Sequence, residues 1–180
     1  YAAAYLELGW ANIRLGDSLG LSSPHDTFPK AREALTKALS IDENIANAHT
    51  ALGVYYFKYE WNWPAAEREF QRAIDLDPGE PTAYSEYAAY LISIGRFDDA
   101  VRMRETSRKL LPATAGTANE LGHVYYYARN YERSLDYYRE ALDLRPNFPP
   151  TRVQIAQCYL AMHRYHEAVA EIEKAVEATE

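Results

Sequence analysis

Three small groups of residues have side chains that could do chemistry. Cys158, His163 and His166 form a C-x4-H-x2-H string, and thiolate and imidazole are ligands that zinc prefers. A structural zinc site normally has four ligands, and only three are local here. The helical pattern places Cys158 inside a helix and His163 at a turn. We therefore interpret these residues as core and turn residues, and we predict no metal site.

The other two groups are candidate catalytic residues. Ser23, His25 and Asp26 supply the residue types of a triad, but close neighbours in sequence seldom reach the required geometry, and no nucleophile elbow is present. His123, near Glu120, is either one member of a proton-transfer pair or a contact whose protonation varies near neutral pH. We favour the contact to a partner, and we predict no catalytic residue, no cofactor and no enzyme. An enzyme site near His123 stays as a remote alternative.

Composition excludes further classes. The 180 residues hold 26 acidic against 19 basic side chains, a net charge of −7, which argues against a nucleic-acid partner. One cysteine cannot form an internal disulfide, so we expect a reducing, cytoplasmic location. The longest apolar run, residues 51–57, is interrupted by Gly53 and is too short for membrane insertion. No signal peptide is visible, and the start at Tyr1 suggests a piece of a longer protein.

An internal repeat of about 34 residues organises the chain. Small residues recur at Gly9, Gly53, Ala88, Gly122 and Ala156. A second series is Ala31, Ala66, Ala100, Ser134 and Ala168. A third, aromatic, is Phe28, Trp63, Phe97, Tyr131 and Tyr165, and a fourth is Glu43, Pro78, Pro112, Pro146 and Glu180. Four series with one common period indicate a true structural repeat.

Each repeat predicts two amphipathic helices. Small residues such as Gly122 and Ser134 are expected where the two helices cross, because a large side chain would push their axes apart. Pro146 lacks an N–H group and ends the second helix. A hairpin of two such helices cannot cover its own apolar face, so neighbouring hairpins must stack.

These residues carry a family resemblance. The motif His49-x2-Leu52-Gly53-x2-Tyr56 is followed by Ala66, Phe70, Ala73 and Pro78. The motif Ala118-x2-Leu121-Gly122-x2-Tyr125 is followed by Ser134, Tyr138, Ala141 and Pro146. The chain resembles the tetratricopeptide repeat (TPR) proteins over essentially its whole length. The resemblance implies an all-α fold, an α-solenoid that forms a right-handed superhelix of about five TPR hairpins in a single domain. The predicted repeats are residues 2–45, 46–80, 81–114, 115–148 and 149–180.

Two repeats depart from the family pattern. The first carries about ten extra residues, and its glycine, serine and proline content predicts a loop at residues 16–29. The second has one extra residue within 59–63, where Trp61 is added beside Trp63. The segment EWNWPAAEREF at residues 60–70 resembles the C-terminal TPR regions of bacterial multidomain regulators, which carry an upstream kinase, cyclase or winged-helix domain.

The family implies a concave groove lined by the first helix of each hairpin. Carried over residue by residue, its lining includes Trp10, Arg14, Asn47, Thr50, Val54, Phe57, Lys58, Ser85, Ala89, Asn119, His123, Tyr126, Tyr127 and Gln157. We expect this groove to be mostly neutral, with aromatic anchors and with Arg14 and Lys58 as its strong cations. Some TPR proteins grip a chaperone carboxylate with Lys and Asn at the fifth and ninth places of a repeat. Those places hold Leu6 and Trp10 in the first repeat, so we do not predict a chaperone clamp.

The sequence therefore predicts a protein–protein interaction module that presents its groove to a peptide or protein partner. The alternative is a regulatory region that senses an effector for a bacterial kinase, cyclase or transcription regulator. Both ends of the predicted stack are bare. Tyr1, Tyr5 and Leu8 have no preceding hairpin, and at the other end Ile172 and Val176 are expected to pack on the fourth repeat while Val169 and Ala170 flank them with no capping helix beyond. These edges predict either self-association between copies or continuation into further repeats.

Overall fold

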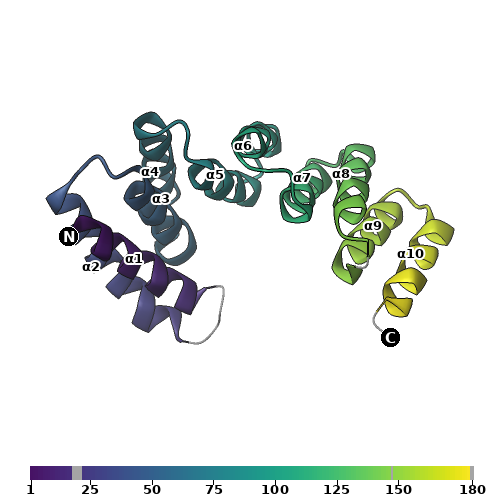
Figure 1. The fold of residues 1–180 in the computed structure, drawn as a ribbon, viewed down its shortest axis with the longest axis horizontal. Coiled ribbons are helices and arrows are strands. Elements are labelled where there is room, and N and C mark those ends of the chain that lie inside the picture. Colours follow the sequence, from purple (N-terminus) through teal and green to yellow (C-terminus); the bar gives the residue numbers. More distant parts are fainter. Residues whose placement is uncertain (18–21, 147, 179–180) are drawn as a thin grey trace. The chain divides into compact units, whose positions relative to one another are not determined.

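The computed structural model describes residues 1–17, 22–146 and 148–178. Ten α-helices and one π-helical turn account for 82% of these residues, which confirms the predicted all-α fold of helical hairpins (Figure 1). Within the described ranges, none of the helices combines the length and the apolar character that crossing a membrane requires. The chain divides into two compact units, residues 1–90 and 91–180, which are described in turn.

Unit 1 is built from the first two hairpins and most of the following helix. Its elements are α1 (Ala2–Gly16), α2 (Pro24–Ile41), α3 (Ala46–Tyr55), the π-helical turn η1 (Tyr56–Glu60), α4 (Trp63–Leu76) and α5 (Pro81–Ser93) as far as Tyr90. Helix α1 packs against α2, and α3 packs against α4. Successive hairpins also touch, because α2 packs against α3 and the ring of Phe70 stacks on Tyr87, 5.5 Å between centroids.

Small residues lie where the paired helices cross, as the sequence predicts. A Cβ atom built on Gly9 would lie 2.6 Å from Leu35, and one built on Gly53 would lie 2.6 Å from Phe70. Both distances are well inside van der Waals contact. The glycines therefore allow α1 to approach α2, and α3 to approach α4, closely enough to bury the large side chains opposite them.

The extra residue of the second repeat is absorbed by the backbone. The end of the first helix widens into η1, and inserting one residue into a helix commonly produces such a π-helical turn. Trp61 then adopts the left-handed conformation, with φ of 55°. Asn62 begins the next helix, because its side chain accepts a hydrogen bond from the Ala65 backbone N–H at 3.2 Å.

The loop predicted at residues 16–29 is shorter than expected. Gly16 is the last residue of α1, and α2 already begins at Pro24. Ser23 accepts a hydrogen bond from the backbone N–H of His25, and a proline at the first helical position loses no helical bond. Pro29 lies inside α2, so proline content alone was a misleading loop signal here. Residues 18–21 of the predicted loop lie outside the described residues.

Unit 2 repeats the same construction. Its helices are α6 (Phe97–Leu110), α7 (Ala115–Tyr127), α8 (Tyr131–Leu144), α9 (Pro149–Ala161) and α10 (Tyr165–Glu177), preceded by the last turn of α5. Helix α7 packs on α8 and α9 packs on α10, while α8 also packs on α9. The ring of Tyr138 lies directly over Gly122, and the Ser134 hydroxyl donates to the Gly122 carbonyl oxygen at 2.7 Å. Leu135 and Tyr138 share one buried cluster with Ile155 and Tyr159.

Turn chemistry recurs with the repeat. Trp61, Gly95, Arg129 and His163 are spaced 34 residues apart and all have positive φ, from 55° to 77°. Each lies between the first and second helix of its repeat. Pro78, Pro112 and Pro146 each follow two residues after the end of a second helix. Helices α3, α5, α7 and α9 begin at residues 46, 81, 115 and 149.

Candidate partner-binding surface

A cavity of about 360 Å³ in unit 1 is lined by the first helices of successive repeats. Its walls come from α1, α3 and α5, together with the residues that follow α1 and α3. The lining residues are Glu7, Trp10, Ile13, Arg14, Asp17, Asn47, Val54, Lys58, Thr82 and Glu86. Five of these belong to the groove that the family resemblance implies: Trp10, Arg14, Asn47, Val54 and Lys58.

A hydrogen bond fixes the aromatic wall of this cavity. The indole Nε1 of Trp10 donates to Oδ1 of Asn47 at 2.9 Å, across 37 residues of sequence. Trp10 is half-buried, so one part of the ring packs between α1 and α3 while another part lines the cavity. An aromatic side chain that is already held in place loses little conformational entropy on binding, which favours its use as an anchor.

The cavity is more charged than the sequence suggested. The expectation of a mostly neutral lining is wrong here, because Glu7, Asp17 and Glu86 contribute carboxylates beside Arg14 and Lys58. The Nζ atom of Lys58 lies 2.5 Å from Oδ2 of Asp17, so these two charges compensate each other. Sequence spacing could have found Glu7, which precedes Trp10 by three residues and so shares its face of the helix.

Two of the predicted groove residues are buried. Thr50 is wholly covered and its hydroxyl donates to the Ala46 carbonyl oxygen at 3.3 Å, while Val54 is covered almost completely. The prediction that Thr50 lines the groove is wrong, because α3 is packed by α1, α2 and α4 at once. Val54 closes the floor of the cavity, and Thr50 is a core residue.

Phe57 also differs from its predicted role. It is half-buried and packs in an aromatic cluster with Trp63 and Tyr90, at 5.8 Å between centroids in each case. The reason is η1: a π-helical turn rotates successive side chains by less than an α-helix does, so Phe57 leaves the stripe that α-helical spacing predicts. Ser85 and Ala89 lie half-buried on α5.

Unit 2 exposes further predicted groove residues on α7 and α9. His123 and Tyr127 of α7 are exposed, as is Gln157 of α9. The side chain of Asn119 is fixed by a hydrogen bond, because its Oδ1 accepts from the Thr151 hydroxyl at 3.0 Å. Tyr126 is half-buried and packs against the core of this unit, so it stabilises the fold and offers little surface to a partner.

The surroundings of His123 favour the neutral form of its imidazole. Its Nε2 contacts the side-chain amide of Gln154, and its edge faces the ring of Tyr138 at 5.9 Å. Desolvation and the positive charge of Arg104 lower the pKa of His123 below its ordinary value. Glu120, the partner that the sequence suggested for proton transfer, instead binds Arg104 at 2.8 Å.

Comparison with known families identifies this architecture. The family model described as tetratricopeptide repeat matches residues 62–102. The family model described as anaphase-promoting complex, cyclosome, subunit 3 matches residues 95–175, so the two matches together extend from α4 to α10. The chain is a tetratricopeptide repeat protein.

Relatives of this TPR protein have varied names. It is 26% identical over 176 residues to the type IV pilus assembly protein PilF of Pseudomonas aeruginosa, covering 93% of this chain and 66% of PilF. It is 27% identical over 118 residues to Hsp70-Hsp90 organizing protein 2 of Arabidopsis thaliana, covering 66% of this chain and 20% of that protein. The solved structure of MamA from Desulfovibrio magneticus, residue 41 to its end, superimposes with a TM-score of 0.79 at 18% identity, covering 99% of this chain and 94% of that one. Among these curated relatives, the chain spans just under two thirds of the length of PilF and one fifth of the length of Hsp70-Hsp90 organizing protein 2.

Two other groups that the sequence singled out were the possible zinc ligands Cys158, His163 and His166 and the possible triad Ser23, His25 and Asp26. In the structure, residues of both groups make other contacts. Cys158 is buried in α9, where its Sγ lies 3.3 Å from the Ser134 hydroxyl. His163 is at the following turn, with Nδ1 2.8 Å from the Tyr165 hydroxyl. Ser23 serves as the N-cap of α2, and Nδ1 of His25 lies 3.3 Å from the hydroxyl of Tyr59.

Proposed function

We propose that this TPR protein is a protein–protein interaction module whose unit 1 cavity binds a peptide segment of a partner protein. The observation that carries the proposal is the cavity wall in which Trp10 is bonded to Asn47 beside the exposed guanidinium of Arg14. A fixed aromatic side chain next to a charged group is a common arrangement at energetically dominant positions of interfaces.

The lining defines the chemistry of the segment. Lys58 is already paired with Asp17, which leaves Arg14 as the cation best placed to meet a carboxylate of the partner. Trp10 and Ile13 offer apolar surface beside it. The segment we propose therefore has an apolar side chain for Trp10 and an acidic residue close to it in sequence. The volume of about 360 Å³ suits a small number of side chains and not a folded domain.

The similarity to Hsp70-Hsp90 organizing protein 2 does not extend to a carboxylate clamp in our proposal. At the fifth and ninth places, where a clamp has Lys and Asn, the first repeat has the half-buried Leu6 and Trp10. The second repeat has the buried Thr50 and Val54 at these places. None of these four side chains can bind a terminal carboxylate as an ammonium group does. We infer an internal peptide segment as the ligand.

The finer predictions from the sequence form part of the same proposal. We infer a non-catalytic module with no nucleic-acid partner, acting in the cytoplasm, where one unpaired cysteine is compatible with the reducing conditions. Control of an upstream bacterial kinase, cyclase or transcription regulator stays a prediction.

The test begins with a random peptide library displayed on phage and panned against the protein. A peptide selected in this way is then titrated by fluorescence anisotropy against the wild type, Trp10→Ala and Arg14→Glu. We expect each substitution to weaken binding by about tenfold or more. Trp61→Ala is the control, since Trp61 is an equally large, exposed aromatic residue outside the cavity lining. Failure to enrich any peptide, or equal affinity for the wild type and Trp10→Ala, would overturn the proposal.

A further inference from the structure

Helix α10 exposes an apolar stripe that its own unit does not cover. Tyr165, Val169, Ile172 and Val176 are 58%, 58%, 42% and 54% exposed. Their spacing of four, three and four residues places them on one face of the helix. Isolated exposed apolar residues are ordinary, but four of them in line form a patch of the kind that marks an interaction site.

The repeat shows what normally covers these positions. The residues 34 positions earlier than Val169 and Ile172 are Leu135 and Tyr138, which are 0% and 1% exposed. Leu135 and Tyr138 are buried because α9, the first helix of the next hairpin, packs over α8. The stripe on α10 is therefore shaped to receive the first helix of another hairpin.

Helix α1 presents the complementary face. Leu8 stands immediately before the small residue Gly9 and is 51% exposed. The residues at the same place in the other repeats are Leu52, Tyr87, Leu121 and Ile155, which are 8%, 6%, 0% and 3% exposed. The position is buried in every other repeat: Tyr87 stacks on Phe70 of the preceding hairpin, and Ile155 shares a cluster with Leu135. Leu8 therefore marks a first helix that has the contact surface but no neighbour within the described chain.

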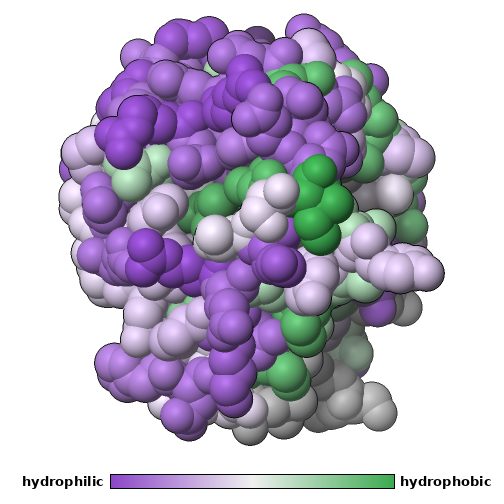
Figure 2. Space-filling view, turned by 90° about the vertical axis from the view of Figure 1, so that its left-hand side faces the viewer, coloured by the Kyte–Doolittle hydropathy of each residue, from purple (hydrophilic) through white to green (hydrophobic). Residues whose placement is uncertain are grey.

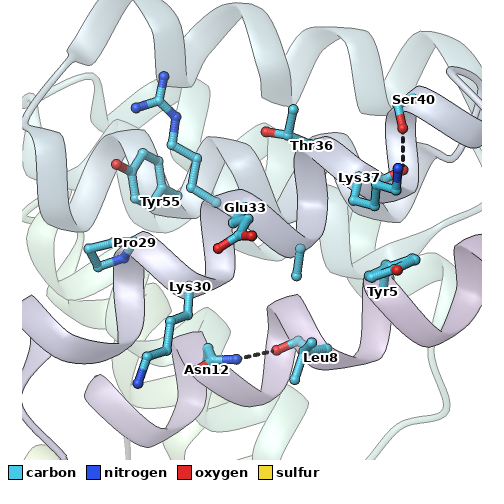
Figure 3. Close-up of a pocket in the computed structure, with 12 residues that line it drawn as sticks. Tyr5, Leu8, Asn12, Pro29, Lys30, Glu33, Thr36, Lys37, Ser40 and Tyr55 are labelled. Carbon is cyan, nitrogen blue, oxygen red and sulfur yellow. Dashed lines mark hydrogen bonds between the residues drawn. The ribbon is translucent and has the colours of Figure 1, made fainter.

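A groove of about 1000 Å³ runs between α1 and α2 at this face (Figure 3). Tyr5 and Leu8 give it an apolar side, and Lys30, Glu33 and Lys37 of α2 line it as well. Figure 2, viewed from the side where α1 and α2 lie in Figure 1, shows hydrophobic residues gathered between hydrophilic ones. An apolar groove with charged residues along its edges suits an amphipathic helix.

The charges of the two faces match. Arg32 of the groove is paired with Glu60 at 3.3 Å, which leaves Lys30 and Lys37 as its cations against one carboxylate. On α10, Glu173 and Glu177 are exposed beside Ile172 and Val176, with Lys174 the one basic residue among them. Complementary charge of this kind fixes partner choice and register more than it adds affinity.

We propose that a second copy of this chain docks head to tail, with the stripe of α10 from one copy in the α1–α2 groove of the next. The contact would repeat between molecules the packing of a second helix on a following hairpin that α8 and α9 already show within the chain. Because two different faces meet, the contact is heterologous, and each copy keeps one free face of each kind. This inference goes beyond the peptide-binding proposal and uses none of the residues that line the unit 1 cavity.

Complementation of two variants tests the geometry. Leu8→Glu removes the groove face and leaves α10 intact, while Ile172→Glu removes the stripe and leaves the groove intact. By sedimentation velocity, we expect the wild type to associate further as concentration rises. Each variant alone is expected to be monomeric, and the two mixed are expected to form a 1:1 dimer that grows no further. A monomeric wild type would overturn the proposal, as would a variant that still dimerises alone, because that result indicates contact between like faces.

Two controls keep the test decisive. Leu144→Glu changes a leucine of 50% exposure outside both faces and is expected to associate as the wild type does.

If Leu8→Glu or Ile172→Glu has lost helical circular dichroism, the double variant Lys30→Glu with Lys37→Glu is used instead. We expect this double variant to be monomeric by itself. Mixing it with a second double variant, Glu173→Lys with Glu177→Lys, should restore association, because each altered face then meets one of opposite charge. If the mixture stays monomeric, the proposed pairing is contradicted. Trp10→Ala is expected to associate normally, so that failure of the peptide-binding proposal and failure of this one give different results.

Discussion

The imidazole of His49 lies 2.7 Å from the carboxylate of Glu69, Nδ1 to Oε2, and this contact joins α3 to α4. The other ring nitrogen, Nε2, lies 3.0 Å from the carbonyl oxygen of Glu43. A carboxylate and a carbonyl can only accept hydrogen bonds, so both contacts are satisfied together only when both ring nitrogens carry a proton. The hydrogen bond to Glu69 is the main cause of the raised pKa of His49, with desolvation opposing it.

We predict that His49 stabilises the fold in a pH-dependent way. Its folded pKa is above the unfolded value of about 6.5, so its contribution is fully present below that pH and is lost as pH rises through the folded pKa. His49→Gln should therefore lower the free energy of unfolding on the order of 1 kcal/mol near pH 6, and by less near pH 9. Urea denaturation at both values measures the difference.

A surface residue that does not ionise supplies the control for this prediction. Gln157 is exposed on α9, and Gln157→Ala should change the free energy of unfolding equally at the two pH values. If His49→Gln costs the same stability near pH 6 as near pH 9, the imidazolium–carboxylate contact contributes nothing beyond packing.

The approach of α7 to α8 depends on the absence of a side chain at Gly122. A Cβ atom there would lie 2.8 Å from Cζ of Tyr138 and closer still to two other ring carbons. Gly122→Leu should cost about 1–3 kcal/mol or more in unfolding free energy through overpacking. Gly116 is the matched control on the same helix, because a Cβ atom there would meet Thr114 only at 3.6 Å. Equal destabilisation by Gly116→Leu would show that loss of glycine itself, and not the contact with Tyr138, is responsible.

The left-handed turn residues predict opposite effects at two equivalent positions. Gly95 has φ of 77° and a Cβ atom there would meet nothing within 4 Å, so Gly95→Ala tests backbone conformation alone. We expect it to cost about 1 kcal/mol. Arg129 holds the same conformation with φ of 58°, and Arg129→Gly should stabilise the fold by about 0.5 kcal/mol, the relief of strain being partly offset by glycine entropy. Thermal unfolding of both variants measures this, and destabilisation by Arg129→Gly would indicate that its side chain makes a compensating contact.

Much of the fold follows from the repeat alone. The positions of Gly9, Gly53 and Gly122 are readable in sequence because close helix crossings tolerate no side chain, and the prolines mark helix ends because they lack a donor. Pro24 and Pro29 show the limit of that rule. Pro24 stands at the first position of α2, where a missing N–H costs no helical bond, whereas Pro29 lies further inside the helix and removes one. Local composition does not reveal which side of a helix start a proline occupies.

The candidate site was less accessible to sequence reasoning. Trp10, Arg14, Asn47 and Lys58 fall on the stripe that regular α-helical spacing predicts, and they line the cavity. Phe57 does not, because one inserted residue changes the helix geometry locally at η1. The burial of Thr50 depends on three helices packing on α3 together, which spacing within α3 cannot report.

The single cysteine gives a direct probe of how unit 2 opens. Cys158 is wholly buried, and the one hydroxyl proton of Ser134 is donated to the Gly122 carbonyl, so the thiol acts as the donor in its 3.3 Å contact with Ser134. Burial raises the pKa of this thiol and so disfavours the reactive thiolate.

We therefore predict that Cys158 reacts with Ellman's reagent on the order of 100-fold or more slowly in the native protein than in guanidinium chloride, at a rate set by local opening of α9 and α10. Because the chain has one cysteine, the absorbance reports this site alone. Ala175 is buried on the α10 side of the last hairpin, and Ala175→Gly should speed the reaction by loosening that packing, whereas Ala2→Gly in unit 1 should leave it unchanged. Rapid stoichiometric labelling of the native wild type would show that the thiol is accessible and that the fifth hairpin does not cover it.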